Sequence, residues 1–259
     1  MKKKTNGVQS VDRAISILDQ LEKSSVPLGV TEISKRLDLH KSTVFGLLST
    51  LENRGFVSQC QESGKYKLGL RLFELGRRVQ ENMDLRAQVN PYLKSLVERF
   101  QETAHLVVKN NNDVVYIDKV DGPQAIRMYS QIGRSTPIHC TGVGKALLAF
   151  LPESEQEKIL ESIELHPFTH KTITDKDVLK KELSEIKKRG YSIDDEEIEI
   201  GLRCIGVPIL DHNGIAVASI SIAGPTTRMT NEKVNMIIEP LKEAAMCISE
   251  TLGFKPSIK

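Results

Sequence analysis

The sequence predicts an α+β fold in two parts: a helical N-terminal part with one short hairpin, and a C-terminal antiparallel sheet flanked by helices. Before residue 55, apolar residues recur at steps of three and four, which is typical of amphipathic helices. After residue 103, short apolar runs alternate with turns rich in Asn, Asp and Gly, which predicts strands. The chain has 259 residues, which is enough for two separate cores.

Composition excludes several classes of protein. The formal net charge is +2, and residues 1–84 hold 14 Lys and Arg against 10 Asp and Glu, so the basic excess lies in the N-terminal part. The sequence has no run of 18 apolar residues and no leader-like apolar stretch, so we expect a cytoplasmic protein with no membrane association. The four cysteines are Cys60, Cys140, Cys204 and Cys247. They form neither a CxxC pair nor a zinc-finger spacing, so we expect reduced thiols, no bound metal and no cofactor.

The N-terminal helices follow a helix-turn-helix pattern. A first helix is expected over residues 11–21, and a second runs from an N-cap at Thr31 through about residue 37. A tight turn at residues 38–40 leads to a third helix over residues 41–54. Two short helices joined by three or four residues are typical of a helix-turn-helix.

A hairpin is expected directly after the third helix. Residues 56–59 and 65–68 are typical of two short strands around a turn at residues 62–64. Such a hairpin is a wing, and a winged helix-turn-helix binds double-stranded DNA through its third helix. Considered alone, the outer face of this helix is more typical of an ordinary solvated helix than of a DNA-binding one. The order of three helices and a hairpin favours DNA binding.

The candidate DNA contacts lie on the outer face of the third helix and on the wing. They are Lys41, Ser42, Thr43, Phe45, Gly46, Ser49, Lys65 and Lys67. We expect Ser42, Thr43 and Phe45 to contact base edges or thymine methyl groups, and the lysines to contact phosphates. Gly46 costs roughly 1 kcal/mol relative to Ala inside a helix. A close approach of DNA or of the second helix would compensate, and the alternative is an uncompensated glycine.

The rest of the chain is expected to form a connector and a second domain. Residues 71–84 continue the helical periodicity, which gives three predicted parts, 1–70, 71–84 and 85–259. The second domain is expected to begin with a helix over residues 85–100 and to have later helices from residues 143, 153, 175 and 231. Its strands are expected at residues 104–109, 114–120, 125–130, 191–194, 204–210 and 215–222.

Several segments together resemble one known family. They are residues 41–44 with 47–48, 52–56, 141–148, 189–191, 196–197 and 204–209. With the order of elements, they make nearly the whole chain similar to the IclR family of bacterial transcription regulators. The resemblance implies a GAF-like sensor domain, homodimers joined through the N-terminal domains, and often a dimer of dimers.

The resemblance also implies an effector site for small carboxylic or aromatic acids beside the sheet. Carried onto this sequence, its lining is Ala125, Met128, Thr136, Gly142, Val143, Asp194, Leu202, Cys204 and Ser221. Two positions depart from the family pattern. Ala223 replaces the serine of a common Ser-Gly-Pro tripeptide, which removes one hydroxyl. Gly46 stands where many relatives have arginine, which removes a guanine contact.

The segment Gly142–Lys145 is similar to a phosphate-binding loop but is not one. A Walker motif needs glycine at His139 and Ser or Thr at Ala146, so ATP hydrolysis is not expected. The backbone donors at the start of the helix near Val143 are instead candidates for binding a carboxylate. The alternative is that these glycines only permit close packing on the sheet.

Other candidate groups fit structural roles better. Neighbours on a strand point to opposite faces, so His139 and Cys140 are not expected to form a catalytic pair. The acidic run at residues 194–197 lacks the spacing of a calcium loop and is typical of a solvated face. The exception is Asp194, for which the family resemblance implies a role in the effector site.

These observations predict a DNA-binding regulator, more often a repressor, whose operator binding responds to a small organic acid such as a sugar acid or a 2-oxo acid. An activator of the same family is the alternative. A cysteine-dependent enzyme would need a histidine beside Cys140 or Cys204, and a redox or metal sensor would need closer cysteines. Neither arrangement is indicated by the spacing.

Overall fold

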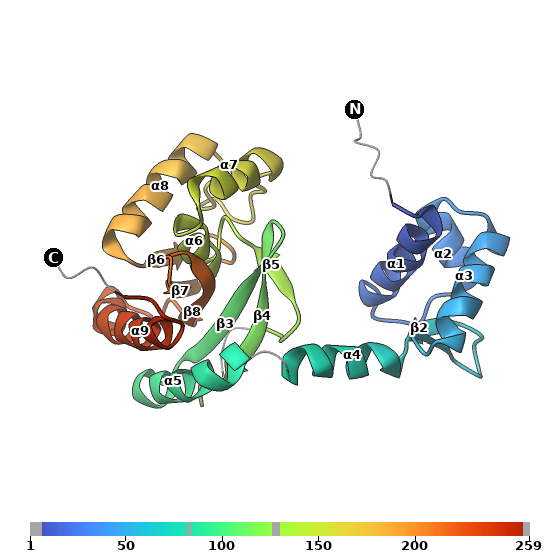
Figure 1. Cartoon of the computed structure of the whole chain (residues 1–259), viewed down its shortest axis with the longest axis horizontal. Helices are drawn as coiled ribbons and strands as arrows, with labels where there is room; N and C mark the ends of the chain where they lie inside the picture. Colours follow the sequence, from blue (N-terminus) through green and yellow to red (C-terminus); the bar gives the residue numbers. More distant parts are fainter. Residues whose placement is uncertain (1–6, 82–83, 126–129, 256–259) are drawn as a thin grey trace. The chain divides into compact units, whose positions relative to one another are not determined.

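The computed structural model describes residues 7–81, 84–125 and 130–255. The chain divides into two compact units, Met1–Met83 and Asp84–Lys259 (Figure 1). The first unit is helical with a two-stranded sheet, and the second holds a six-stranded sheet with helices. The predicted α+β class is confirmed. Among the described residues no helix is long and apolar enough to cross a membrane.

The first unit is a winged helix-turn-helix. Its helices are α1 (Gln9–Glu22), α2 (Val30–Leu37), α3 (Lys41–Asn53) and α4 (Leu70–Glu81), and its wing is β1 (Val57–Gln59) with β2 (Tyr66–Leu68). The apolar stripes of the first three helices meet the inner face of the wing in one core. The buried members of that core are Ile17, Leu21, Leu28, Ile33, Val44, Leu48, Val57 and Tyr66.

The start of α2 corrects one expectation. The N-cap is Gly29 and not Thr31, because the Glu32 side chain reaches back to accept a hydrogen bond of 2.6 Å from the Gly29 amide. A carboxylate in the first turn satisfies a free backbone donor and complements the helix dipole, so it can replace a hydroxyl cap. The turn into α3 lies where it was expected, with Asp38 in the left-handed region at φ 51°.

The second unit is built on one antiparallel sheet of order β5-β4-β3-β8-β7-β6. Its strands are β3 (Thr103–Asn110), β4 (Asp113–Val120), β5 (Ser135–Pro137), β6 (Ser192–Asp195), β7 (Leu202–Leu210) and β8 (Ala216–Pro225). Its helices are α5 (Asp84–Phe100), α6 (Gly142–Ala149), α7 (Glu153–Ser162), α8 (Lys176–Arg189) and α9 (Asn231–Thr251).

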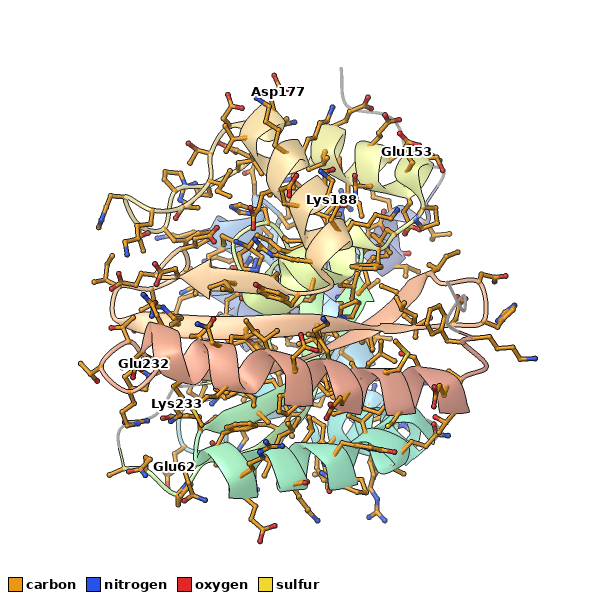
Figure 2. The ribbon with its side chains drawn as sticks, turned by 90° about the vertical axis from the view of Figure 1, so that its left-hand side faces the viewer. Glu62, Glu153, Asp177, Lys188, Glu232 and Lys233 are labelled. Carbon is orange, nitrogen blue, oxygen red and sulfur yellow. The ribbon has the colours of Figure 1, made fainter. Side chains whose placement is uncertain are left out.

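Helices cover both faces of this sheet (Figure 2). In Figure 2, α9, labelled at Glu232 and Lys233, lies with α5 on one side, and α8, labelled at Lys188, lies on the other. The core under α5 and α9 is mainly apolar and includes Leu106, Ile205 and Ile220. Strand residues alternate between faces, so their neighbours His105, Cys204 and Ser221 face the α6 side.

Two strand expectations need correction. β5 was not predicted, because it has only three residues and ends in Pro137, which cannot donate to a ladder. The strand expected over residues 125–130 is not present at its described ends, because Ala125 lies in a bend and Ser130 is outside any strand. Residues 126–129 of that prediction lie outside the described residues.

Candidate DNA-recognition surface and effector site

The outer face of α3 carries the residues expected to meet DNA. Val44 and Leu48 are fully buried, so the helix is fixed with its other face outward. Lys41, Ser42 and Phe45 are on the surface, and the Phe45 ring is 58% exposed. Thr43 and Ser49 are half-buried at the edges of this face. An aromatic ring exposed to this degree can make an apolar contact with thymine methyl groups.

Gly46 is open to solvent on the same face. A Cβ atom added there would have nothing within 4 Å, so α2 does not press on this position. Close packing of α2 against Gly46, one of the two compensations considered for this glycine, is thereby excluded. The Thr50 hydroxyl donates to the Gly46 carbonyl over 2.9 Å, so the nearest polar side chain is turned toward the helix backbone. Such a surface permits a close approach of DNA.

The wing is tied to the helix-turn-helix by an ion pair. Lys65 Nζ lies 3.3 Å from Glu32 Oε2, the same carboxylate that caps α2. Both side chains are more than 40% exposed, so the pair is worth little to stability. Lys67, directly opposite Ser58 in the register, is exposed. The two wing lysines therefore differ in how freely they can reach a phosphate.

The start of α6 lies directly on β7. A Cβ at Gly206 would fall 2.3 Å from the Gly142 carbonyl oxygen, and a Cβ at Gly142 would fall 3.0 Å from Cys204 Sγ. Glycine is therefore required at position 206, and a side chain at position 142 would press on Cys204. Thr141 caps the helix by accepting from the Gly144 amide over 3.1 Å. Glycine at positions 142 and 206 brings the helix N-terminus onto the polar face of the sheet.

A chain of hydrogen bonds crosses this face. The Val143 amide and the Ser221 side chain both lie near the Cys204 thiol. Ser221 Oγ lies 3.3 Å from His105 Nδ1, and His105 Nε2 lies 2.8 Å from Ser130 Oγ. Burial lowers the pKa of His105 to about 3, so its ring is neutral and can donate from one nitrogen and accept at the other. Either tautomer satisfies both serines.

A buried charged group lies beside this chain. Asp194 is opposite Cys204 in the register, and burial raises its pKa to about 7. Its carboxylate accepts from the Glu197 amide over 2.8 Å. The Lys145 ammonium is buried too, and it bonds to the Glu197 carboxylate and the Ile193 carbonyl. Glu197 therefore corrects the expectation that the acidic run is a solvated face.

The structure gathers most of the predicted effector residues, but not all of them. Gly142, Val143, Cys204 and Ser221 meet over the sheet, with Asp194 beside them and Leu202 two positions before Cys204 on the same face. Thr136 on β5 lies near the Tyr116 side chain. Ala125 is exposed in its bend. Met128 lies outside the described residues.

Sequence reasoning missed four residues of this cluster: His105, Tyr116, Lys145 and Glu197. The Tyr116 ring lies 5.1 Å from the His105 ring, and burial raises the pKa of Tyr116. The available signal for His105 was a lone histidine inside an apolar strand. Lys145 and Glu197 are 52 positions apart, so only the fold shows that they pair.

The thiols on this face are poorly suited to nucleophilic chemistry. Burial raises the pKa of Cys204 to about 12 and also raises that of Cys140. Both therefore stay protonated at neutral pH, whereas the thiolate is the nucleophile. His139 is directed to the His166 carbonyl at 3.3 Å. Within the described ranges, no group of three His, Cys, Asp or Glu residues is placed to hold a metal ion.

Comparison with known proteins assigns both units to one family. Residues 10–60 match the IclR helix-turn-helix domain, and residues 77–250 match the C-terminal domain of the bacterial transcriptional regulator IclR. The chain belongs to the IclR family. It is a DNA-binding transcription regulator with a C-terminal effector-binding domain.

Relatives in this family align over almost the full chain. The HTH-type transcriptional regulator KdgR of Escherichia coli is 39% identical over 252 residues, which is 97% of this chain and 95% of that protein. The HTH-type transcriptional repressor AllR of Klebsiella pneumoniae is 38% identical over 250 residues, 96% of this chain and 92% of AllR. The structure is also similar to the crystal structure of an IclR homolog complexed with 4-hydroxybenzoate, from Microbacterium hydrocarbonoxydans. The TM-score is 0.80 and the sequence identity is 25%, and the match covers 94% of this chain and 99% of the homolog's chain.

Proposed function

We propose that this IclR-family regulator is a repressor whose affinity for its operator is set by a small organic acid bound at the polar face under α6. The main support is a buried row of polar groups, Cys204, Ser221 and His105, that ends at the N-terminus of α6, with Ser221 Oγ 3.3 Å from His105 Nδ1. Helix N-termini present backbone donors and a positive dipole, which favours a carboxylate. The polar side chains beside it supply specificity.

Two features support repression by steric occupation of DNA. AllR, 38% identical to this chain, is named a repressor. The α3 surface and the exposed Lys67 of the wing are the parts that would cover an operator half-site. The effector would act through linkage, because a ligand that binds one conformation more tightly changes the population that binds DNA. An activator of the same family remains the alternative.

A homodimer fits the apolar groove on the first unit. The groove has a volume of about 490 Å³ and is lined by α1, α3 and Phe56, and its floor is apolar. Val11 and Ile15 in it are 53% and 50% exposed, although both are large aliphatic side chains. A second copy placing its own α1 here would bury them, and the two recognition helices would then read two half-sites. Ile15→Glu is expected to give monomers by sedimentation velocity, whereas Asp19→Glu on the exposed side of α1 is not.

A thermal-shift screen tests the effector proposal. Small 2-oxo acids, sugar acids and aromatic acids are added to the full chain, and a ligand that prefers the native state raises the melting temperature. Calorimetry on Ser221→Ala then tests the site. Losing its hydrogen bond to a buried ligand is expected to cost about 1–3 kcal/mol of binding free energy. Ser184→Ala, on the exposed side of α8, is the matched control. Equal affinity in both variants would place the effector elsewhere.

A further inference from the structure

Strand β4 contains a bulge that turns one carboxylate away from the polar face of the sheet. Successive residues of β3, 106 and 107, pair with Asp118 and Tyr116, so Ile117 is an extra residue in β4. An extra residue of this kind shifts the alternation of side chains between the two faces of a sheet. Ile117 packs against the core under α5, and Asp118 pairs with Arg86 on α5. Two neighbouring side chains therefore face the same helix.

The residues on either side of this bulge face the effector site instead. The Tyr116 ring lies 5.1 Å from the His105 ring. Lys119 is opposite His105 in the register and donates to the Ser130 carbonyl over 3.0 Å, and the Ser130 hydroxyl lies 2.8 Å from His105 Nε2. Four consecutive residues of β4 thus contact both sides of the sheet. A shift of the His105 cluster would pass through this short segment to the α5 side.

Asp118 holds two successive turns of α5. Its side chain is 2% exposed, and Oδ1 lies 3.1 Å from Arg86 Nε, while Oδ2 accepts from Asn90 Nδ2 over 2.7 Å. Arg86 and Asn90 are four positions apart, so they lie on one face of the helix. A buried carboxylate depends on such partners, and here each oxygen has one. Asp118 therefore fixes the start of α5 on β4.

The start of α5 is joined directly in sequence to the DNA-binding unit. The helix packs on β3 and β4 (Figure 1). It begins at Asp84, and the preceding helix, α4, ends at Glu81. A movement of the first turns of α5 therefore acts on α4 through the chain itself.

We propose that Asp118 is the positioning residue through which an acid bound at the effector site resets α5 and, through α4, changes the affinity for the operator. This inference rests on the proposed function, since the acid that shifts His105 and Tyr116 is bound at the site proposed above. The Asp118 side chain faces away from that acid. It therefore contributes to the coupling between the two sites and not to the binding of the acid.

A second buried carboxylate provides a matched control. Glu102, beside the start of β3, is also 2% exposed, and it is bound by Arg228 and by Lys233 on α9. Lys233 is 26% exposed and Arg86 is 33% exposed, and both lie in the first turn of a helix. However, α9 is not joined in sequence to α4. Glu102→Gln is therefore the control for Asp118→Asn, and Lys233→Met is the control for Arg86→Met.

The coupling ratio of the full chain tests the proposal. This ratio is the affinity for the DNA upstream of its own gene without an acid, divided by the affinity at a saturating concentration of pyruvate, D-gluconate or 4-hydroxybenzoate. An acid that gives a ratio of about five or more in the parent should give less than about two in Asp118→Asn and Arg86→Met. Calorimetry should show the parent's affinity for the acid in both variants. Arg86→Lys should recover part of the ratio, and both controls should keep it.

Three results would overturn the inference. The parent's ratio in Asp118→Asn and Arg86→Met shows that the carboxylate carries no coupling. An equal fall in the controls shows that any loss of stability in this domain lowers the ratio, for which melting temperatures provide the comparison. A fall in acid affinity as large as the fall in the ratio shows that Asp118 acts on the effector site itself.

Failure of the proposed function is a separate outcome. If none of the three acids changes the parent's affinity for DNA, that proposal fails for these acids, and amide hydrogen exchange without any acid tests the inference. Asp118→Asn is expected to speed exchange in the first turns of α5 and also in α4, whereas Glu102→Gln leaves α4 unchanged. Exchange in α4 that equals the parent's would show that Asp118 has no influence beyond its own domain.

Discussion

Lys145 and Glu197 form an ion pair in the interior of the sensor domain, with Lys145 1% exposed and Glu197 7% exposed. Nζ of Lys145 contacts Oε1 of Glu197, and among the described residues Glu197 Oε2 has no hydrogen-bond partner. The Glu197 carbonyl also accepts from the Thr172 hydroxyl over 2.6 Å. The pair therefore joins α6, on which the effector site is proposed, to the loop between β6 and β7, and the Glu197 carbonyl joins that loop to the one between α7 and α8.

Removing one member of this pair is expected to destabilise the sensor domain strongly. Lys145→Met leaves the Glu197 carboxylate buried without a counter-charge, which costs about 3–5 kcal/mol of unfolding free energy. The combined change Lys145→Met and Glu197→Leu should recover most of that loss, because a buried pair is replaced by apolar side chains. Urea denaturation measures both, with the exposed Lys180→Met as the control. A single variant as stable as the parent contradicts the assignment.

Asp194 predicts a pH dependence of a defined sign. Its pKa is raised to about 7 in the folded chain, against about 3.9 in an unfolded one. Between pH 4 and 7 the native state binds a proton that the unfolded state does not, so this contribution is full below pH 4 and is lost as the pH rises through 7. Asp194→Asn should therefore gain stability over the parent progressively from pH 4 to 8.

Melting temperatures of both proteins across this range measure that difference. The low pKa of His105 acts in the opposite direction, because a neutral buried imidazole loses stability as the pH falls below about 6.5. His105 is present in both proteins, so its effect cancels in the comparison. If the melting temperatures of the two proteins differ by the same amount at every pH from 4 to 8, Asp194 titrates normally in the folded chain.

Gly46→Ala separates folding from DNA binding. Its helical position has open space around the added Cβ, so alanine should stabilise α3 by up to roughly 1 kcal/mol. If DNA approaches this surface closely, the same methyl group should weaken operator binding. A higher melting temperature together with a lower affinity in a gel-shift titration is the expected pair of results. Higher stability with unchanged affinity would show that DNA does not approach Gly46.

The wing lysines should differ in their contribution to binding. Lys67 is exposed, so Lys67→Ala should lower the salt slope of DNA affinity by about 1 on specific and random DNA alike. Lys65 must exchange Glu32 for a phosphate, so Lys65→Ala should weaken binding less. Titrations at several salt concentrations measure both slopes, with Lys180→Ala as the control. A larger effect at Lys65 would reverse this order.

Sequence patterns predicted the helices well because each has one apolar face. The period of Val44 and Leu48 placed α3, and its outer face followed from that alone. Contacts between distant residues could not be predicted in this way. His105 meets Ser221 only because β3 and β8 pair, although 116 positions separate them. The cap of α2 was placed wrongly because a carboxylate three residues downstream replaced the expected hydroxyl.

The central claim is that a small acid bound in the C-terminal domain controls the binding of DNA by the N-terminal domain. The direct measurement is a DNA-binding titration of the full chain at fixed salt, using the region upstream of its own gene and random DNA of the same length. We expect a strong preference for the upstream region, which falls at least fivefold when an acid identified by thermal shift is added. Equal binding to both DNAs, or an affinity that the acid leaves unchanged, would contradict it.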